Sequence, residues 1–127
     1  MAKVLGLGGV FFKCANKEAL TTWYSEALGM QLSEHGSIEF SLDDLPAGSY
    51  NVWGPFLGDT EYFLPSRKDF MINLMVDDVD GVLERARAGG AEIVAEIEDY
   101  DFGRFGWFVD PEGNKIELWQ PKSASST

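Results

Sequence analysis

The chain contains an internal repeat, because its two halves show the same order of secondary-structure signals and end on related segments. Tyr50–Pro55 reads YNVWGP and Ile116–Pro121 reads IELWQP, so a tryptophan and a proline recur at identical offsets. Six positions alone do not exclude chance, but the same order of elements surrounds both segments. Internal repeats indicate duplicated structural units that pack together. The sequence therefore predicts two related modules.

The first module is expected at about residues 4–55. Val4 to Cys14 is apolar and β-prone, which predicts a strand. Asn16 is a suitable N-cap for a helix from Lys17 to about Ala27, and Gly29 follows at a C-cap position. Three short strands are then expected at 31–35, 37–42 and 49–55, the last two separated by a polar turn at 43–48.

The second module is expected at about residues 69–121, after a connection at 56–68 that carries Gly, Pro and charges. It repeats the order of the first, so each module is predicted to be βαβββ and the fold class α+β. Its expected elements are a strand at 69–76, a helix capped by Asp77 or Asp78 and running to about Ala88, a strand at 92–97, and two strands at about 104–109 and 114–120 joined by the turn 110–113. The polar tail, 122–127, is expected to be mobile.

Composition limits the possible partners and location. The 127 residues suit one domain, and the net charge of −11 argues against nucleic acid, which requires clustered Lys and Arg. That acidity fits either simple solubility or attraction of a cationic ligand. No apolar run is long enough to span a bilayer, and the start lacks a cleavage site for a signal peptide. A single cysteine, Cys14, excludes an internal disulfide and suits a reducing compartment, so we expect a cytoplasmic protein.

The closing segment Phe108–Leu118, FVDPEGNKIEL, is similar to the signature of the vicinal oxygen chelate superfamily. This superfamily includes glyoxalase I, extradiol dioxygenases and the fosfomycin- and bleomycin-resistance proteins. ALGM at 27–30, which follows Trp23-Tyr24, and VDDVD at 76–80 resemble its helix boundaries, and the resemblance covers residues 6–121. It implies one domain in which two βαβββ modules form a curved, incomplete mixed β-barrel around a central cleft. It also implies a homodimer, since in the resistance proteins the dimer interface completes the ligand pocket.

Strand alternation predicts which side chains face that cleft, because successive side chains point to opposite faces of a strand. Ile116 and Leu118 on the last strand, and Ile72 and Leu74 on the fifth, are apolar and expected in the core. The residues expected to face the cleft are Gly9, Phe11, Lys13, Ser49, Asn51, Trp53, Met71, Asn73, Met75, Lys115, Glu117 and Trp119. Tyr62, Phe63, Phe102, Phe105 and Trp107 are expected at its rim.

The resemblance places the metal ligands of the metal-dependent relatives at Gly9, Asn51, Met71 and Glu117. Glycine has no side chain, asparagine coordinates weakly and methionine is too soft for the hard metals of this family. Glu117 alone is a normal ligand, whereas a catalytic metal usually has about three protein ligands. His35, the only histidine, matches none of the positions. We therefore predict no metal and no cofactor.

The leading hypothesis is a metal-independent, homodimeric small-molecule-binding protein resembling the bleomycin-resistance branch. It would bind an aromatic or cationic compound, although the same aromatic residues fit core filling or dimer burial equally well. The alternative is a lyase, isomerase or dioxygenase, either with other metal ligands or with Glu117 as a general base whose pKa is raised by an apolar cleft. The candidate ligand-binding residues are Phe11, Lys13, Asn51, Trp53, Met71, Asn73 and Trp119.

Overall fold

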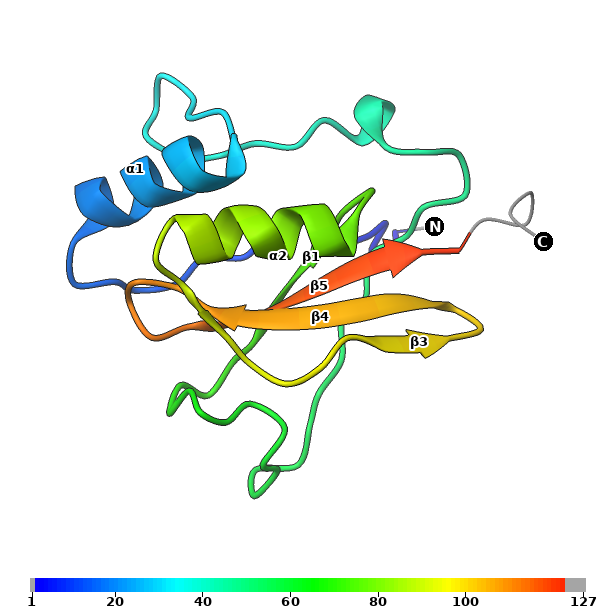
Figure 1. Ribbon diagram of the computed structural model, residues 1–127. Helices are drawn as coiled ribbons and strands as arrows, with labels where there is room; N and C mark the ends of the chain where they lie inside the picture. The colour runs from blue at the N-terminus through cyan, green and yellow to red at the C-terminus, as the bar shows by residue number, and fades with distance from the viewer. Residues whose placement is uncertain (1, 123–127) are drawn as a thin grey trace.

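The structure, a computed structural model, describes residues 2–122 and has an α+β fold (Figure 1). The predicted tail at 123–127 lies outside these residues. None of the helices between residues 2 and 122 has the length and apolar character needed to cross a bilayer. The elements in chain order are α1 (Lys17–Leu28), the short 3-10 helix η1 (Leu42–Asp44), β1 (Ile72–Met75), α2 (Val79–Ala88), β2 (Glu92–Ile93), β3 (Glu98–Tyr100), β4 (Gly103–Val109) and β5 (Lys115–Pro121).

All five strands belong to one mixed sheet that comes from the second half of the chain. The strand order is β1-β5-β4-β2, with β3 also paired to β4. β1 runs parallel to β5, and the other pairs are antiparallel. The sheet is open and not closed into a barrel, and α2 covers one face while α1 lies beyond α2 (Figure 1). The order of elements along the chain, a strand, a helix and then further strands, agrees with the βαβββ order predicted for the second half, apart from one additional short strand.

The core lies between α2 and the sheet. Helical spacing brings Val79, Leu83 and Ala86 to one face of α2, where they meet a buried cluster on the two long strands. Gly106 permits this close approach, because a Cβ there would lie only 2.7 Å from Leu83 Cδ1. The strand members of the cluster are Phe108, Ile116 and Leu118, which confirms the predicted core face of β5.

Helix α1 begins and ends where the sequence predicts. The Asn16 side chain accepts a hydrogen bond from the Ala19 backbone N–H, and Gly29 ends the helix with a φ of 72°. The ring of Trp23 lies 5.8 Å from that of Phe108 between centroids. Its Nε1 donates to the backbone carbonyl of Gly89 at 2.8 Å. Helix α1 is thereby attached to the second half of the chain.

The signature turn between β4 and β5 is a second attachment point for α1. Asp110 is buried, and its carboxylate accepts hydrogen bonds at 2.8 Å from the hydroxyl of Tyr24 and from Asn114 Nδ2. Glu112 accepts from the backbone N–H groups of residues 15 and 16, at 2.8 and 2.9 Å. These two bonds hold the pKa of Glu112 below its usual value. The acidic residues of the motif thus join the start of α1 to the sheet.

The first half differs from the prediction. Between residues 2 and 71 the structure contains α1, η1 and an isolated antiparallel bridge between Leu32 and Ile38, but no strand. The strands predicted at 4–14, 31–35, 37–42 and 49–55 are therefore wrong for the single chain. Their composition is β-prone, but a strand exists only where a neighbouring strand accepts its hydrogen bonds, and none of these segments is paired in a sheet within residues 2–122.

One prediction in the second half also needs correction. Of the strand expected at 92–97 only β2 forms, and β3 begins just after it at Glu98, because the backbone between them turns at Ala95 with a positive φ of 65°. An L-residue with positive φ cannot continue a regular strand. The break lets both short strands pair with β4.

Candidate ligand cleft

The sheet face opposite α2 carries a cluster of polar and aromatic side chains. Register places Glu117 of β5 directly beside Asn73 of β1 and Trp107 of β4. Residues directly opposite one another in a ladder share a face. The side chains predicted to face the cleft from β1 and β5 therefore share one face of the sheet, with Trp119 next to Phe105 on the same side.

Glu117 is the centre of this cluster. Its side chain is buried, at 8% exposed, and both carboxylate oxygens accept hydrogen bonds. Oε1 accepts from Asn73 Nδ2 at 2.7 Å, and Oε2 accepts from Trp107 Nε1 at 2.9 Å and from the hydroxyl of Tyr62. Hydrogen bonds to a charged acceptor are the strong ones, and three of them satisfy a buried carboxylate.

Lys115 lies against the same aromatic side chains. Its Nζ is 4.8 Å from the ring centroid of Tyr62 and 5.9 Å from that of Trp107, and it donates to the backbone carbonyl of Tyr62. Burial lowers the pKa of Lys115, while the charge of Glu117 opposes that change. Burial, and then the hydrogen bond and charge of Glu117, raise the pKa of Tyr62. Tyr62 therefore stays a neutral hydrogen-bond donor at physiological pH.

Aromatic rings extend the cluster along the sheet. Phe105 is stacked on Trp119 at 6.4 Å with an interplanar angle of 11°, and it lies 6.5 Å from Trp107. Tyr50, from the first half, meets Trp119 edge to face at 5.3 Å. Such a row of rings offers flat apolar surface beside a few oriented polar groups, which is the usual lining of a small-molecule site.

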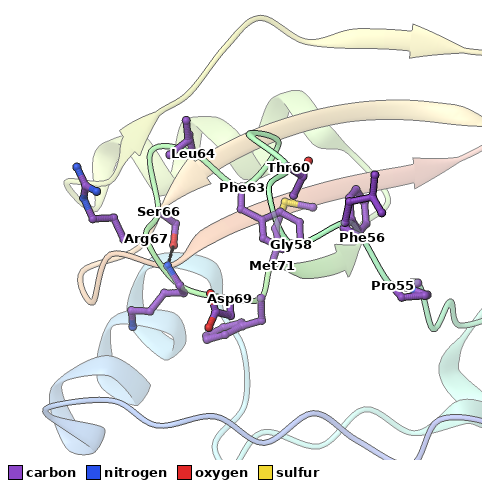
Figure 2. A pocket seen from close by; sticks show the side chains of 14 residues that line it. Pro55, Phe56, Gly58, Thr60, Phe63, Leu64, Ser66, Arg67, Asp69 and Met71 are labelled. Carbon is purple, nitrogen blue, oxygen red and sulfur yellow. Dashed lines mark hydrogen bonds between the residues drawn. The ribbon is translucent and has the colours of Figure 1, made fainter.

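A pocket of about 580 Å³ adjoins this cluster and is formed by the segment 54–71 (Figure 2). Phe56 and Phe63 provide its aromatic wall, and their rings lie 5.1 Å apart. Met71, the residue before β1, also lines this pocket (Figure 2). The ring of Phe56 also stacks on Tyr62 at 5.7 Å. The pocket and the Glu117 cluster therefore share one wall.

The structure brings together only part of the predicted site. Asn73, Glu117 and Trp119 lie on the cleft face of the sheet, and Met71 lines the adjoining pocket. The other four candidates lie on the first-half segments that lack strand partners, and all four are exposed. These are Phe11, Lys13, Asn51 and Trp53, with Phe11 95% and Trp53 80% exposed.

Two residues of the cluster were expected only at the cleft rim. Trp107 belongs to β4, and strand alternation on β4 would have placed it beside Glu117, since its neighbour Phe108 is a core residue. Tyr62 has no such signal, because it lies in an irregular segment 55 positions before Glu117. It was expected at the rim only because it is aromatic and lies in the connection between the two modules.

The chain's residues do not fit the metal of the family's metal-dependent members. Of the four implied ligand positions, Gly9 has no side chain, Asn51 is exposed on an unpaired segment and Met71 is a thioether. Glu117 is already bonded to three donors. Across residues 2–122, no three or more His, Cys, Asp or Glu side chains gather closely enough to hold a metal ion.

The open mixed sheet with α2 on one face, closed by the signature turn, defines a glyoxalase-like fold. The model of the glyoxalase-like domain family matches residues 9–119, and the chain belongs to this family. No protein of curated function matches the sequence.

Solved structures share the fold. A protein from the mobile metagenome of V. Pseudocholerae has a TM-score of 0.60 and 19% identity, over 97% of this chain and 99% of that one. TnmS3, an antibiotic binding protein from Streptomyces sp. CB03234, has a TM-score of 0.51 and 24% identity, over 86% and 89%. A glyoxalase/bleomycin resistance protein from the same organism has a TM-score of 0.50 and 24% identity, over 84% and 93%. At these identities the likeness concerns the fold alone.

Proposed function

We propose that this chain is a metal-independent small-molecule-binding protein of the glyoxalase/bleomycin-resistance type, which binds an aromatic or cationic compound beside Glu117. One observation carries the proposal. The carboxylate at the family's last ligand position is buried among aromatic rings and bonded to three donors of its own chain. An ion that took this carboxylate would have to displace donors that already satisfy it.

The surroundings of Glu117 support an aromatic ligand. The rings of Phe105 and Trp119 present parallel surfaces, and Asn73 offers a polar group from the edge strand. Flat ligands gain dispersion energy on such surfaces and take their orientation from a few hydrogen bonds. The net charge of −11 further favours a cationic compound through long-range attraction. The fold shared with an antibiotic binding protein agrees with this class of function.

We further propose that the functional form is a homodimer in which the first halves of two copies complete each other's clefts. Of the eighteen large apolar side chains exposed in residues 2–122, sixteen lie between Val4 and Leu64. An exposed apolar surface of this extent marks an interaction site. The segments that carry it are β-prone and unpaired, and β1 has one unpaired edge. Pairing between copies would bring Phe11, Lys13, Asn51 and Trp53 to the cleft.

Light scattering coupled to size exclusion tests the dimer. Trp53→Asp places a charge in the proposed interface and is expected to yield monomer. Phe102→Asp is the matched control, because Phe102 is also a largely exposed aromatic residue but lies between β3 and β4. A wild-type protein that elutes as monomer at micromolar concentration contradicts the proposal.

Intrinsic fluorescence tests ligand binding, because Trp107 and Trp119 both lie on the sheet face that carries Glu117. The wild-type chain is titrated with bleomycin-like, quinone and other aromatic compounds, and thermal unfolding is measured in parallel. We expect at least one compound to quench fluorescence and raise the unfolding temperature. Absence of both effects across the panel contradicts the proposal.

The same purified protein also tests the alternative that the chain is an enzyme. General-base catalysis by Glu117 requires a free lone pair in reach of the substrate. If any bound compound is turned over, and Glu117→Gln abolishes turnover while preserving affinity, the chain is an enzyme. We propose a cytoplasmic location for either function, because the single cysteine suits a reducing compartment.

A further inference from the structure

The three donors to Glu117 differ in how firmly the fold holds them. Asn73 and Trp107 come from β1 and β4, and the backbone ladders fix both strands against β5. Tyr62 comes from the irregular segment before β1, is 40% exposed, and its neighbour Glu61 is exposed as well. Tyr62 is therefore the one donor that lies outside the sheet, so its whole segment can move without disturbing a backbone ladder.

The surroundings of the Tyr62 ring form a defined site, which we call the Tyr62 ring site. Phe56 lies nearly parallel to the ring at 5.7 Å, and Trp107 meets it at 85° and 6.4 Å. The ammonium of Lys115 lies over it at 4.8 Å from the centroid. At the far end, Glu117 Oε2 accepts the hydroxyl. These four groups recognise an aromatic ring that carries a hydroxyl group.

The buried carboxylate restricts what can replace Tyr62. A buried acceptor that loses a donor carries a desolvation cost, about 1–3 kcal/mol and more for a charged group. An apolar ring in the Tyr62 ring site would leave Glu117 Oε2 with only the hydrogen bond from Trp107. A phenol would restore the lost hydrogen bond, so the number of bonds to Glu117 would not change.

Resting on the proposed function, we propose that Tyr62 is an internal substitute for the ligand. A hydroxyl-bearing aromatic compound displaces the Tyr62 side chain, and its hydroxyl donates to Glu117 Oε2. No covalent bond changes in this exchange. Because Tyr62 is tethered, it competes at an effective concentration in the millimolar range, so a simple phenol binds the wild type weakly.

The test uses p-cresol, which matches the tyrosine side chain, and toluene, which lacks the hydroxyl. Affinities are measured by calorimetry. We expect Tyr62→Ala to bind p-cresol at least tenfold more tightly than wild type does, and at least tenfold more tightly than Tyr62→Ala binds toluene. Tyr100→Ala is the matched control, because Tyr100 is also an exposed tyrosine whose hydroxyl donates to a glutamate, Glu98, but it is not bonded to Glu117; this variant should bind p-cresol like wild type. Equal affinity of Tyr62→Ala for both compounds, or no gain over wild type, overturns the inference.

A second measurement avoids the variant if Tyr62→Ala does not fold. In wild type, p-cresol is expected to increase amide hydrogen exchange at residues 56–68, while toluene at the same concentration leaves it unchanged. No increase with p-cresol overturns the inference. A further result distinguishes failure of this inference from failure of the proposed function. A panel compound without a hydroxyl that binds wild type and Tyr62→Ala equally overturns this inference, but it still supports small-molecule binding.

Discussion

Replacing Glu117 with leucine removes the acceptor that joins three parts of the chain. Trp107 is only 4% exposed, so its indole N–H loses its partner without reaching water, which costs about 1–3 kcal/mol. The buried ammonium of Lys115 also loses the nearby negative charge. Asn73 and Tyr62 are exposed enough to turn toward solvent and add little. We expect Glu117→Leu to lower the free energy of unfolding by about 2–4 kcal/mol.

Glu117→Gln is the matched control because it preserves the shape. Its amide oxygen can take the position of Oε2 and accept from Trp107 and Tyr62. Its amide nitrogen can then donate to the side-chain oxygen of Asn73, once that amide has rotated. Only the charge assistance is lost, so we expect a destabilisation of about 1 kcal/mol.

The assay is urea unfolding followed by tryptophan fluorescence, with all variants at one protein concentration because a dimer's stability depends on concentration. The double variant Glu117→Leu/Trp107→Phe removes both partners of one bond. It should be more stable than the sum of its single variants predicts, by at least about 1 kcal/mol. If the free energy of unfolding of Glu117→Leu lies within about 0.5 kcal/mol of the wild-type value, or equals that of Glu117→Gln, then Glu117 is not a buried, hydrogen-bonded carboxylate.

Other regions of the fold give further predictions. Gly106→Ala should cost about 1–3 kcal/mol in urea unfolding, because the new methyl group would overlap Leu83; an unchanged midpoint would contradict the close helix packing. The backbone N–H groups of residues 15 and 16 lower the pKa of Glu112, so the stability that its carboxylate contributes is present above its unfolded pKa and is lost as pH falls. Glu112→Gln should therefore lose less thermal stability in acid than wild type does. Identical acid profiles of the two proteins would refute this. Burial raises the pKa of Tyr24 above its ordinary value near 10, so the stability that the neutral hydroxyl contributes is complete below pH about 10 and is lost as pH rises further. Tyr24→Phe should therefore reduce the loss of stability with rising pH by up to about 1.4 kcal/mol per pH unit. An unaltered pH dependence above pH about 10 would contradict this role of Tyr24.

Both helices and the sheet of the second half were predictable because their sequence signals agree with their tertiary contacts. The N-cap residues Asn16 and Asp78 bond the helices they begin, and alternation along β5 separates core from cleft. The signature turn was recognisable as a motif before its role was known. That role, attachment of α1 through Asp110 and Glu112, depends on residues 85 or more positions away and leaves no local pattern.

The first half and the candidate site were less predictable for physical reasons. Residues 4–14 and 49–55 have strand composition, but composition does not supply a neighbouring strand, and neither segment is paired with one in the part of the chain that the structure describes. Strand alternation predicted that Glu117 and Asn73 face the same side of the sheet, whereas their direct pairing depends on the register of the ladder, which the sequence did not give. It could not identify Tyr62 as a donor, since an irregular segment has no periodicity from which to infer where a side chain points.

Metal content of the purified protein tests the central claim most directly. The chain is purified without chelators, supplied in turn with Ni²⁺, Zn²⁺, Mn²⁺ and Fe²⁺, desalted, and analysed by elemental mass spectrometry. Because Glu117 is bonded to three donors of its own chain, we expect far less than one ion per chain, and the same trace level in Glu117→Gln. One ion per chain in wild type, lost in Glu117→Gln, would show that this carboxylate binds a metal and would contradict the account.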